Sequence, residues 1–178
     1  MKKKIINIFG STGEIGSKSI SILLNNFNFY KINLLVANRN YKKLIYQAKL
    51  LKPNYICLLD KSKISLLKKN LINTKIKIIE PDNLYSYIYK SSSDITLISI
   101  SGYNALNYLL PIFKNTNLIG MVNKECIVSA GHLFNNLCKK YKTQIFPIDS
   151  EHFSLFQYIN NSEFKNIKTK NIYLTASG

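Results

Sequence analysis

The sequence of 178 residues is 46% hydrophobic, which suffices for one buried core and the beginning of a second domain and excludes a disordered chain. No apolar run approaches the ~20 residues needed to span a bilayer, and a strand-like run begins almost directly after Met1, so we expect a cytoplasmic protein with no leader peptide and no membrane partner. The formal net charge is +16, but the basic residues include a single arginine and the lysines are scattered over the whole length, so we interpret them as solvated surface and expect no nucleic-acid partner.

Short apolar runs alternate with amphipathic stretches, which is the pattern of a parallel sheet with helices on both faces. The first run, residues 4–9, is rich in β-branched residues and stops at Gly10, after which a helix is expected. The residues that would share one face of this helix are Ile15, Ser19, Ile22 and Leu23. A second strand at 32–37 and a helix at about 41–51, which ends before Pro53, complete a βαβ unit.

The alternation continues up to Asp149 and then changes. Further strands are expected at 54–59, 75–80, 94–100, 117–120 and 143–148, with helices between them. A helix at about 151–159 and a strand at 171–175 would begin a new unit. Because a new strand needs partners that this sequence does not supply, we expect the chain to be part of a longer protein. The predicted fold class is α/β, with a Rossmann-like doubly wound parallel sheet over residues 1–149 and the start of a second, α+β domain over residues 150–178.

The cysteines and histidines do not indicate a metal site. Cys57, Cys126 and Cys138 are odd in number and lack the close spacing of zinc ligands, so we expect reduced, structural thiols. His132 and His152 are more simply explained as structural residues than as ligands.

A glycine-rich turn joins the first strand to the first helix. Gly10, Gly13 and Gly16 follow the spacing GxxGxxG, and such a turn brings backbone N–H groups and a helix N-terminus up to a phosphate. The first two glycines would allow close approach, and Gly16 would let the helix pack on the sheet. In this strand-turn-helix context the motif predicts dinucleotide binding, the alternative being a merely structural turn.

The end of the second strand indicates which dinucleotide is bound. An Asp or Glu at this point would bind the ribose 2′-hydroxyl and repel a 2′-phosphate. This chain instead has Asn38, Arg39 and Asn40. A cation and two amides favour NADP over NAD, unless these are ordinary loop residues.

The segment Asn123-Lys124-Glu125 follows the short strand at 117–120. It would therefore lie at the carboxyl edge of the sheet, where the ligands of α/β folds bind. A lone lysine in so basic a chain is, however, usually a surface residue.

The acidic segment after the strand at 143–148 carries the pair Asp149 and Glu151. In extended backbone these two carboxylates would share one face. Two carboxylates aimed into one site need a cation between them, and hard oxygen ligands select Mg²⁺ or Mn²⁺. The alternative is a helix start, with Asp149 or Ser150 as the N-cap, and the residues alone do not decide between the two.

Four motifs in order together resemble the 1-deoxy-D-xylulose 5-phosphate reductoisomerase family. They are Gly-Ser-Thr-Gly-x-Ile-Gly at 10–16, Asn-Lys-Glu at 123–125, Pro-x-Asp-Ser-Glu-His at 147–152 and Thr-Ala-Ser-Gly at 175–178. The resemblance implies an enzyme that rearranges 1-deoxy-D-xylulose 5-phosphate and reduces the product with NADPH to 2-C-methyl-D-erythritol 4-phosphate, with Mn²⁺ or Mg²⁺ as cofactor. It also implies a homodimer at full length, an NADP-binding domain over 1–149 and a truncated catalytic domain from residue 150.

The resemblance further assigns roles to residues of this chain. The cofactor would be bound by Gly10, Ser11, Thr12, Gly13, Glu14 and Ile15 at its phosphates, by Asn38, Arg39 and Asn40 at its 2′-phosphate end, and by Asn123 and Glu125 at its nicotinamide half. The catalytic residues would be Lys124, Asp149 and Glu151, the last two as metal ligands. The substrate would be bound by Lys124, Ser150, Glu151 and Ser177.

Two positions depart from the family pattern. Glu14 stands where serine is frequent and would put a carboxylate near a pyrophosphate unless its side chain points away, and Asn38 replaces a frequent glycine. Because part of the metal site and of the substrate cover would lie beyond Gly178, this chain alone is expected to be inactive. The alternatives are another NADP-dependent oxidoreductase that shares only the nucleotide domain, and a non-catalytic remnant that binds a nucleotide.

Overall fold

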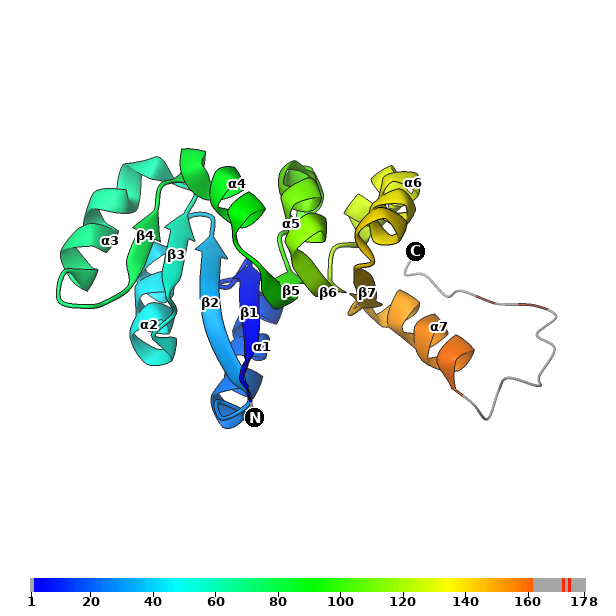
Figure 1. The fold of residues 1–178 in the computed structure, drawn as a ribbon. Helices are drawn as coiled ribbons and strands as arrows, with labels where there is room; N and C mark the ends of the chain where they lie inside the picture. Colours follow the sequence, from blue (N-terminus) through cyan, green and yellow to red (C-terminus); the bar gives the residue numbers. More distant parts are fainter. Residues whose placement is uncertain (1, 162–170, 172, 174–178) are drawn as a thin grey trace.

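The computed structural model describes residues 2–161, 171 and 173. Within these residues, seven parallel strands form one sheet in the order β4-β3-β2-β1-β5-β6-β7. The strands are β1 Lys4–Phe9, β2 Tyr30–Ala37, β3 Tyr55–Leu58, β4 Lys77–Ile79, β5 Ser93–Ile98, β6 Thr116–Met121 and β7 Gln144–Pro147. The chain builds outward from β1 to β4 and then crosses back to place β5 on the other side of β1 (Figure 1).

Helices cover both faces of this sheet. They are α1 Glu14–Asn25, α2 Tyr41–Leu51, α3 Ile64–Leu71, α4 Pro81–Lys90, α5 Leu109–Asn115, α6 Lys124–Tyr141 and α7 Ser150–Asn160, with short 3₁₀ segments η1 Lys61–Lys63 and η2 Gly102–Tyr108. Buried residues of α1, α2 and α3 form one core, and those of α4, α5 and α6 form another on the opposite face (Figure 1). Alternate side chains of β2 pack into the two cores: Leu34 and Val36 belong to one core, and Leu35 and Ala37 belong to the other. The predicted α/β, Rossmann-like doubly wound fold is confirmed.

The first helix buries a different face from the predicted one. Gly16, Ile20 and Leu23 are its buried residues, whereas Ile22 is 63% exposed. The prediction for Ile22 was wrong because the buried face is centred on Gly16, Ile20 and Leu23, and at about 100° per residue Ile22 lies roughly 130° around the axis from that centre.

The end of the described chain differs most from the expectation. Strand β7 stops at Pro147, and Asp149 is the N-cap of α7, so the pair Asp149 and Glu151 does not sit on extended backbone. None of the α7 side chains is fully buried; the helix contacts the sheet through the rings of Phe153 and Phe156, whose centroids lie 5.7 and 5.1 Å from that of Phe146. The predicted strand at 171–175 falls largely outside the described residues, and the domain boundary after Asp149 stays a prediction.

The three cysteines are free thiols, as predicted. Cys57 and Cys126 are buried and Cys138 is half-buried. Burial raises the pKa of Cys57 to about 12, which keeps this thiol protonated and unreactive at neutral pH. None of the helices in the described part of the chain is long and apolar enough to cross a membrane.

The junction of β1, α1 and β5 is packed too closely for side chains at two glycines. Gly10 has a φ of +85°, and a Cβ built there would lie 2.5 Å from the carbonyl oxygen of Ser99, directly after β5. A Cβ at Gly16 would collide with the carbonyl oxygen of Gly10. Gly16 therefore packs α1 onto the turn itself, whereas the sequence had suggested that it packs the helix onto the sheet.

The substitutions Gly16→Ala and Gly131→Ala separate this crowding from helix propensity. Alanine at position 16 should destabilise the protein by about 1–3 kcal/mol, because backbone must move to admit the methyl group. At Gly131 in α6 a Cβ would meet nothing within 4 Å, so alanine should be neutral or stabilising by up to ~1 kcal/mol. Urea unfolding followed by circular dichroism measures both, and equal effects would contradict the packing at Gly16.

Candidate functional site

A cavity of about 390 Å³ opens at the carboxyl ends of β1, β2 and β5. Its lining residues are Gly10, Thr12, Gly13, Val36, Ala37, Asn38, Leu59, Ser99, Ile100, Ser101, Asn104, Asn107 and Tyr108. This is the point where the strand order reverses, between β1 and β5, and ligands of open α/β sheets bind at such a point. The volume falls within the range of roughly 300–1,000 Å³ for small-molecule sites.

The glycine turn presents the N-terminus of α1 to this cavity. Gly13 is the N-cap and supplies no side-chain hydrogen bond, so the first N–H groups of the helix are left for a ligand. Thr12 is half-buried at the cavity wall, whereas Ser11 is buried behind it and its Oγ has no partner among the described residues. The turn can therefore cradle an anion.

The Glu14 carboxylate should repel an anion in the cavity less than the sequence suggested, because it is paired with a lysine. Its carboxylate pairs with the Lys18 ammonium one helical turn further on, at 2.7 Å. Lys18 lowers the pKa of Glu14 by a hydrogen bond and by its charge. The side chain is thus directed along the exposed surface of α1, and its charge is balanced locally.

The three residues after β2 divide between two roles. Asn38 lines the cavity, and Arg39 is exposed beside it. Asn40 is the N-cap of α2, because its Oδ1 accepts from the Lys43 backbone N–H at 3.0 Å. Arg39 is therefore the exposed cation of this segment, next to Asn38 in the chain, while the side-chain oxygen of Asn40 caps α2.

Asn123 ties α6 to the loop that forms the cavity wall. It is the buried N-cap of α6, with its Oδ1 accepting from the Cys126 N–H at 3.0 Å. Its Nδ2 donates to the carbonyl oxygens of Ile100 and Gly102, which follow β5. The side chain is thereby committed to the fold, whereas Lys124 and Glu125 are exposed.

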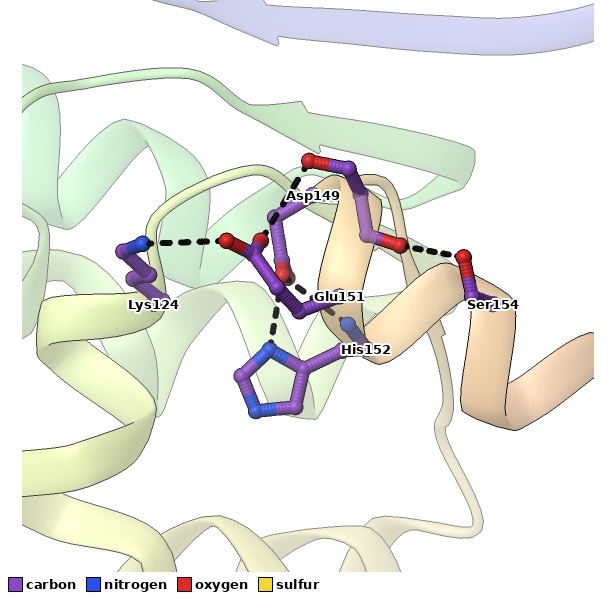
Figure 2. Close-up of polar contacts among 6 residues, drawn as sticks. Lys124, Asp149, Glu151, His152 and Ser154 are labelled. Atoms are coloured by element: carbon purple, nitrogen blue, oxygen red, sulfur yellow. Dashed lines mark hydrogen bonds and ion pairs between the residues drawn. The ribbon is translucent and has the colours of Figure 1, made fainter. Parts of the chain in front are cut away.

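A cluster of charged and polar side chains, separate from the cavity lining, lies where α6 and α7 begin. Figure 2 shows the Lys124 ammonium of α6 facing the Glu151 carboxylate of α7, with 3.8 Å between Nζ and Oε1. Asp149 Oδ1 accepts from the His152 backbone N–H at 3.1 Å and lies 2.7 Å from His152 Nδ1. The structure thus places Lys124, Asp149 and Glu151 at the starts of two neighbouring helices, which is the helix-start alternative for the two carboxylates, and their catalytic roles stay a prediction. Ser150 lies between the carboxylates in sequence and donates its Oγ to Glu151 Oε2 at 3.3 Å; Ser177 lies outside the described residues.

The carboxylates partly fit a divalent cation. Asp149 Oδ2 is buried and has no hydrogen-bond partner among the described residues, which is costly unless a ligand takes up the oxygen. Carboxylate oxygens suit Mg²⁺ and Mn²⁺. Within the same residues, His, Cys, Asp and Glu form no set of three that could hold a metal ion, so further ligands would have to come from elsewhere.

Sequence reasoning missed the wall formed by the loop after β5 and by η2. Its polar residues are Ser99, Ser101, Asn104, Asn107 and Tyr108. The predicted strand at 94–100 ran through the start of this loop. The available signal was its position directly after a strand, but only the pairing of β5 with β1 shows that it faces the glycine turn.

The family profile described as 1-deoxy-D-xylulose 5-phosphate reductoisomerase matches residues 6–131. Two relatives of that name, from Pelagibacter ubique (strain HTCC1062) and Wigglesworthia glossinidia brevipalpis, are 39% identical over 180 residues and 37% identical over 161. These alignments cover 100% and 88% of this chain but only 45% and 40% of the relatives. The chain therefore spans less than half the length of the curated relatives that it matches.

Solved structures agree with the sequence comparisons. The 1-deoxy-D-xylulose 5-phosphate reductoisomerase from Zymomonas mobilis in complex with NADPH superposes with a TM-score of 0.83 at 28% identity, over 88% of this chain and 42% of that chain. A DOX-P reductoisomerase in complex with NADPH, fosmidomycin and magnesium gives a TM-score of 0.81 at 26% identity, over 92% and 40%.

The substitutions Asp149→Ala and Asp149→Asn separate the capping role of this residue from its charge. Alanine removes the acceptor for the His152 N–H, so the free energy of opening α7 should fall by about 0.5–2 kcal/mol. Asparagine caps a helix about as well as aspartate and should preserve α7. Hydrogen exchange of the α7 amides measures the difference, and an equal loss in both variants would show that the cap is not what holds the helix start.

Proposed function

The chain belongs to the 1-deoxy-D-xylulose 5-phosphate reductoisomerase family, and from this we propose that the whole protein is an NADPH-dependent oxidoreductase of isoprenoid biosynthesis. It would rearrange 1-deoxy-D-xylulose 5-phosphate and reduce the product to 2-C-methyl-D-erythritol 4-phosphate with the help of Mg²⁺ or Mn²⁺. The observation that carries the proposal is the cavity at the strand-order reversal, with a bare helix N-terminus in its wall. The carboxylates at the start of α7 form a separate polar cluster that supports the metal.

NADPH would lie across the cavity with its pyrophosphate on the glycine turn. The residues proposed for the phosphates are Gly10, Ser11, Thr12, Gly13, Glu14 and Ile15. Ser11 would act by shaping the turn, since its side chain is buried and its backbone N–H is bonded to the Val36 oxygen. Asn38, Arg39 and Asn40 would face the 2′-phosphate, with Arg39 supplying the charge. The nicotinamide half would extend toward Asn123 and Glu125, because Asn123 is bonded to the cavity loop.

The sugar phosphate would bind between α6 and α7. Asp149 and Glu151 would hold the metal ion, which when bound supplies a Lewis acid for the developing oxygen charge. Lys124 would orient the substrate and, through its ion pair, the Glu151 carboxylate. Ser150 and Ser177 are proposed as further substrate contacts. The unpartnered Asp149 Oδ2 supports the metal assignment.

We also place the enzyme in the cytoplasm, which its three free thiols support, and expect a homodimer at full length on the family resemblance. A different oxidoreductase with the same nucleotide domain would bind NADPH but would not depend on Asp149. A non-catalytic remnant would bind the nucleotide without turnover.

Arg39→Ala tests the cofactor preference on the chain as it stands. Loss of one charge-assisted contact should weaken NADPH binding by about tenfold or more, because such contacts contribute roughly 1.5–3 kcal/mol. NADH binding should change less than twofold, since NADH has no 2′-phosphate. Fluorescence titration of both dinucleotides measures this, and parallel losses for the two would remove Arg39 from the 2′-phosphate site.

Asp149→Asn tests the reaction in the protein at the full length of its relatives. The unchanged enzyme should oxidise NADPH only when 1-deoxy-D-xylulose 5-phosphate and Mn²⁺ or Mg²⁺ are present, as followed at the absorbance of NADPH. The variant should lose at least about a hundredfold in turnover, because a Lewis acid contributes several kcal/mol to such a step. Asp82→Asn, at an exposed acid paired with Lys61, should keep full activity. Turnover of the Asp149 variant without any metal dependence would refute the proposed site.

A further inference from the structure

Behind the glycine turn lies a buried polar residue that the proposed function leaves unused. Gln47, on α2, is only 3% exposed. Its Nε2 donates to the Ser11 carbonyl oxygen at 2.8 Å, and its Oε1 has no partner among the described residues. Burying an amide with one oxygen unpaired costs free energy. A side chain that served only to fill the core would be better replaced by an apolar one.

The hydrogen bond from Gln47 fixes the direction of one peptide group in the turn. The backbone N–H groups of Gly10 and Ser11 both donate to the Val36 carbonyl oxygen, at 2.9 and 3.0 Å, and that of Gly13 donates to the Gly10 oxygen at 3.0 Å. The Ser11 carbonyl oxygen accepts from Gln47 of α2, and at 3.5 Å it is a distant second acceptor for the Ser17 Oγ of α1, which donates to the Gly13 oxygen at 2.5 Å. In a trans peptide the C=O and the next N–H point in opposite directions, and the described residues contain no cis peptide.

The Thr12 N–H is therefore aimed away from α2. Thr12 lines the cavity, and its N–H makes no backbone hydrogen bond within the described part of the chain. It is an oriented, unpaired donor beside the N-terminus of α1. Turning the peptide over would bury this donor against α2 and present a carbonyl oxygen to an incoming phosphate.

We propose that Gln47 is a positioning residue for the dinucleotide phosphates, because it holds the Ser11–Thr12 peptide with the Thr12 N–H directed into the cavity. The inference rests on the proposed function only in naming NADPH as the source of the phosphate. Gln47 also links two parts of the same cavity, since α2 starts directly after Asn38, Arg39 and Asn40 and reaches the turn at Gln47.

The substitution Gln47→Leu removes the hydrogen bond while keeping a similar volume. It should weaken NADPH binding about tenfold, the effect of losing one oriented donor to a charged group. Binding of 2′-AMP, which carries the 2′-phosphate but no pyrophosphate, should change less than twofold. Equal losses for the two ligands would indicate general disruption and overturn the positioning role.

Thr143→Val is the matched control. Thr143 is likewise buried and donates its Oγ1 to a backbone carbonyl, that of Phe113, at 2.6 Å, near β7 and away from the turn. It should lower stability in urea unfolding to a similar extent as Gln47→Leu, without changing the affinity for NADPH. A similar loss of NADPH affinity in this control would assign the effect to stability and overturn the proposal.

Hydrogen exchange of the free chain tests the role of Gln47 without any ligand. The turn amides of Gly10 and Ser11 are hydrogen-bonded to the Val36 oxygen of β2, and that of Gly13 to the Gly10 oxygen. In Gln47→Leu these amides should exchange about tenfold faster, while Thr143→Val leaves them unchanged. Unaltered exchange in Gln47→Leu would overturn the proposal even if NADPH binds as expected. Faster exchange in a chain that does not bind NADPH would support Gln47 as the holder of the turn and refute the proposed function instead. Gln47→Met, with a flexible side chain of similar length, repeats the test if the leucine variant does not fold.

Discussion

The architecture depends on a contact between backbones. At the end of β1 the chain turns so sharply that Gly10 touches the carbonyl group after β5, and the first turn of α1 rests on Gly10 through Gly16. Because side chains are excluded there, the central strand, its helix and the strand on its far side meet at one point. On one side of this point lie β2, β3 and β4, and on the other lie β5, β6 and β7. The helices α1 to α3 pack on one face of the sheet and α4 to α6 on the opposite face, so they leave the edge above this point uncovered. The cavity is the space that this arrangement leaves open.

Two further polar residues, Asn123 and Asp149, lie at the same carboxyl edge of the sheet because they are helix N-caps. Asn123 and Asp149 each follow a parallel strand, and each uses one side-chain oxygen to start the next helix. The side-chain nitrogen of Asn123 binds the cavity loop, whereas the second oxygen of Asp149 has no hydrogen-bond partner in the part of the chain that the structure describes. Each of these two caps therefore has side-chain atoms beyond the one that starts its helix, held at the carboxyl edge of the sheet.

The sequence alone was sufficient for the class of fold but not for its geometry. Short runs rich in β-branched residues and bounded by a turn, such as residues 4–9, favour buried strands of a parallel sheet, so their alternation with helices was recognisable. Strand order is set by packing between distant segments and was not predicted. The sequence left open whether Asp149 and Glu151 lie on extended backbone or at a helix start, because a short acidic segment after a strand is compatible with both. The hydrogen bond from the His152 N–H to Asp149 shows the helix start. Ser99, Asn104 and Tyr108 carry no local motif, and Gln47 reads as an ordinary helix residue until its contact with Ser11 is seen.

The start of α6 has one more consequence. Asn123 is bonded to the loop at the cofactor cavity, and its neighbour Lys124 faces the carboxylate on α7. Consecutive Cα atoms are separated by about 3.8 Å whatever else moves. A displacement of the start of α6 would therefore move the Asn123 contact with the cavity loop and the Lys124 ion pair together. A movement of α7 would change the ion pair while leaving the contact with the cavity loop in place.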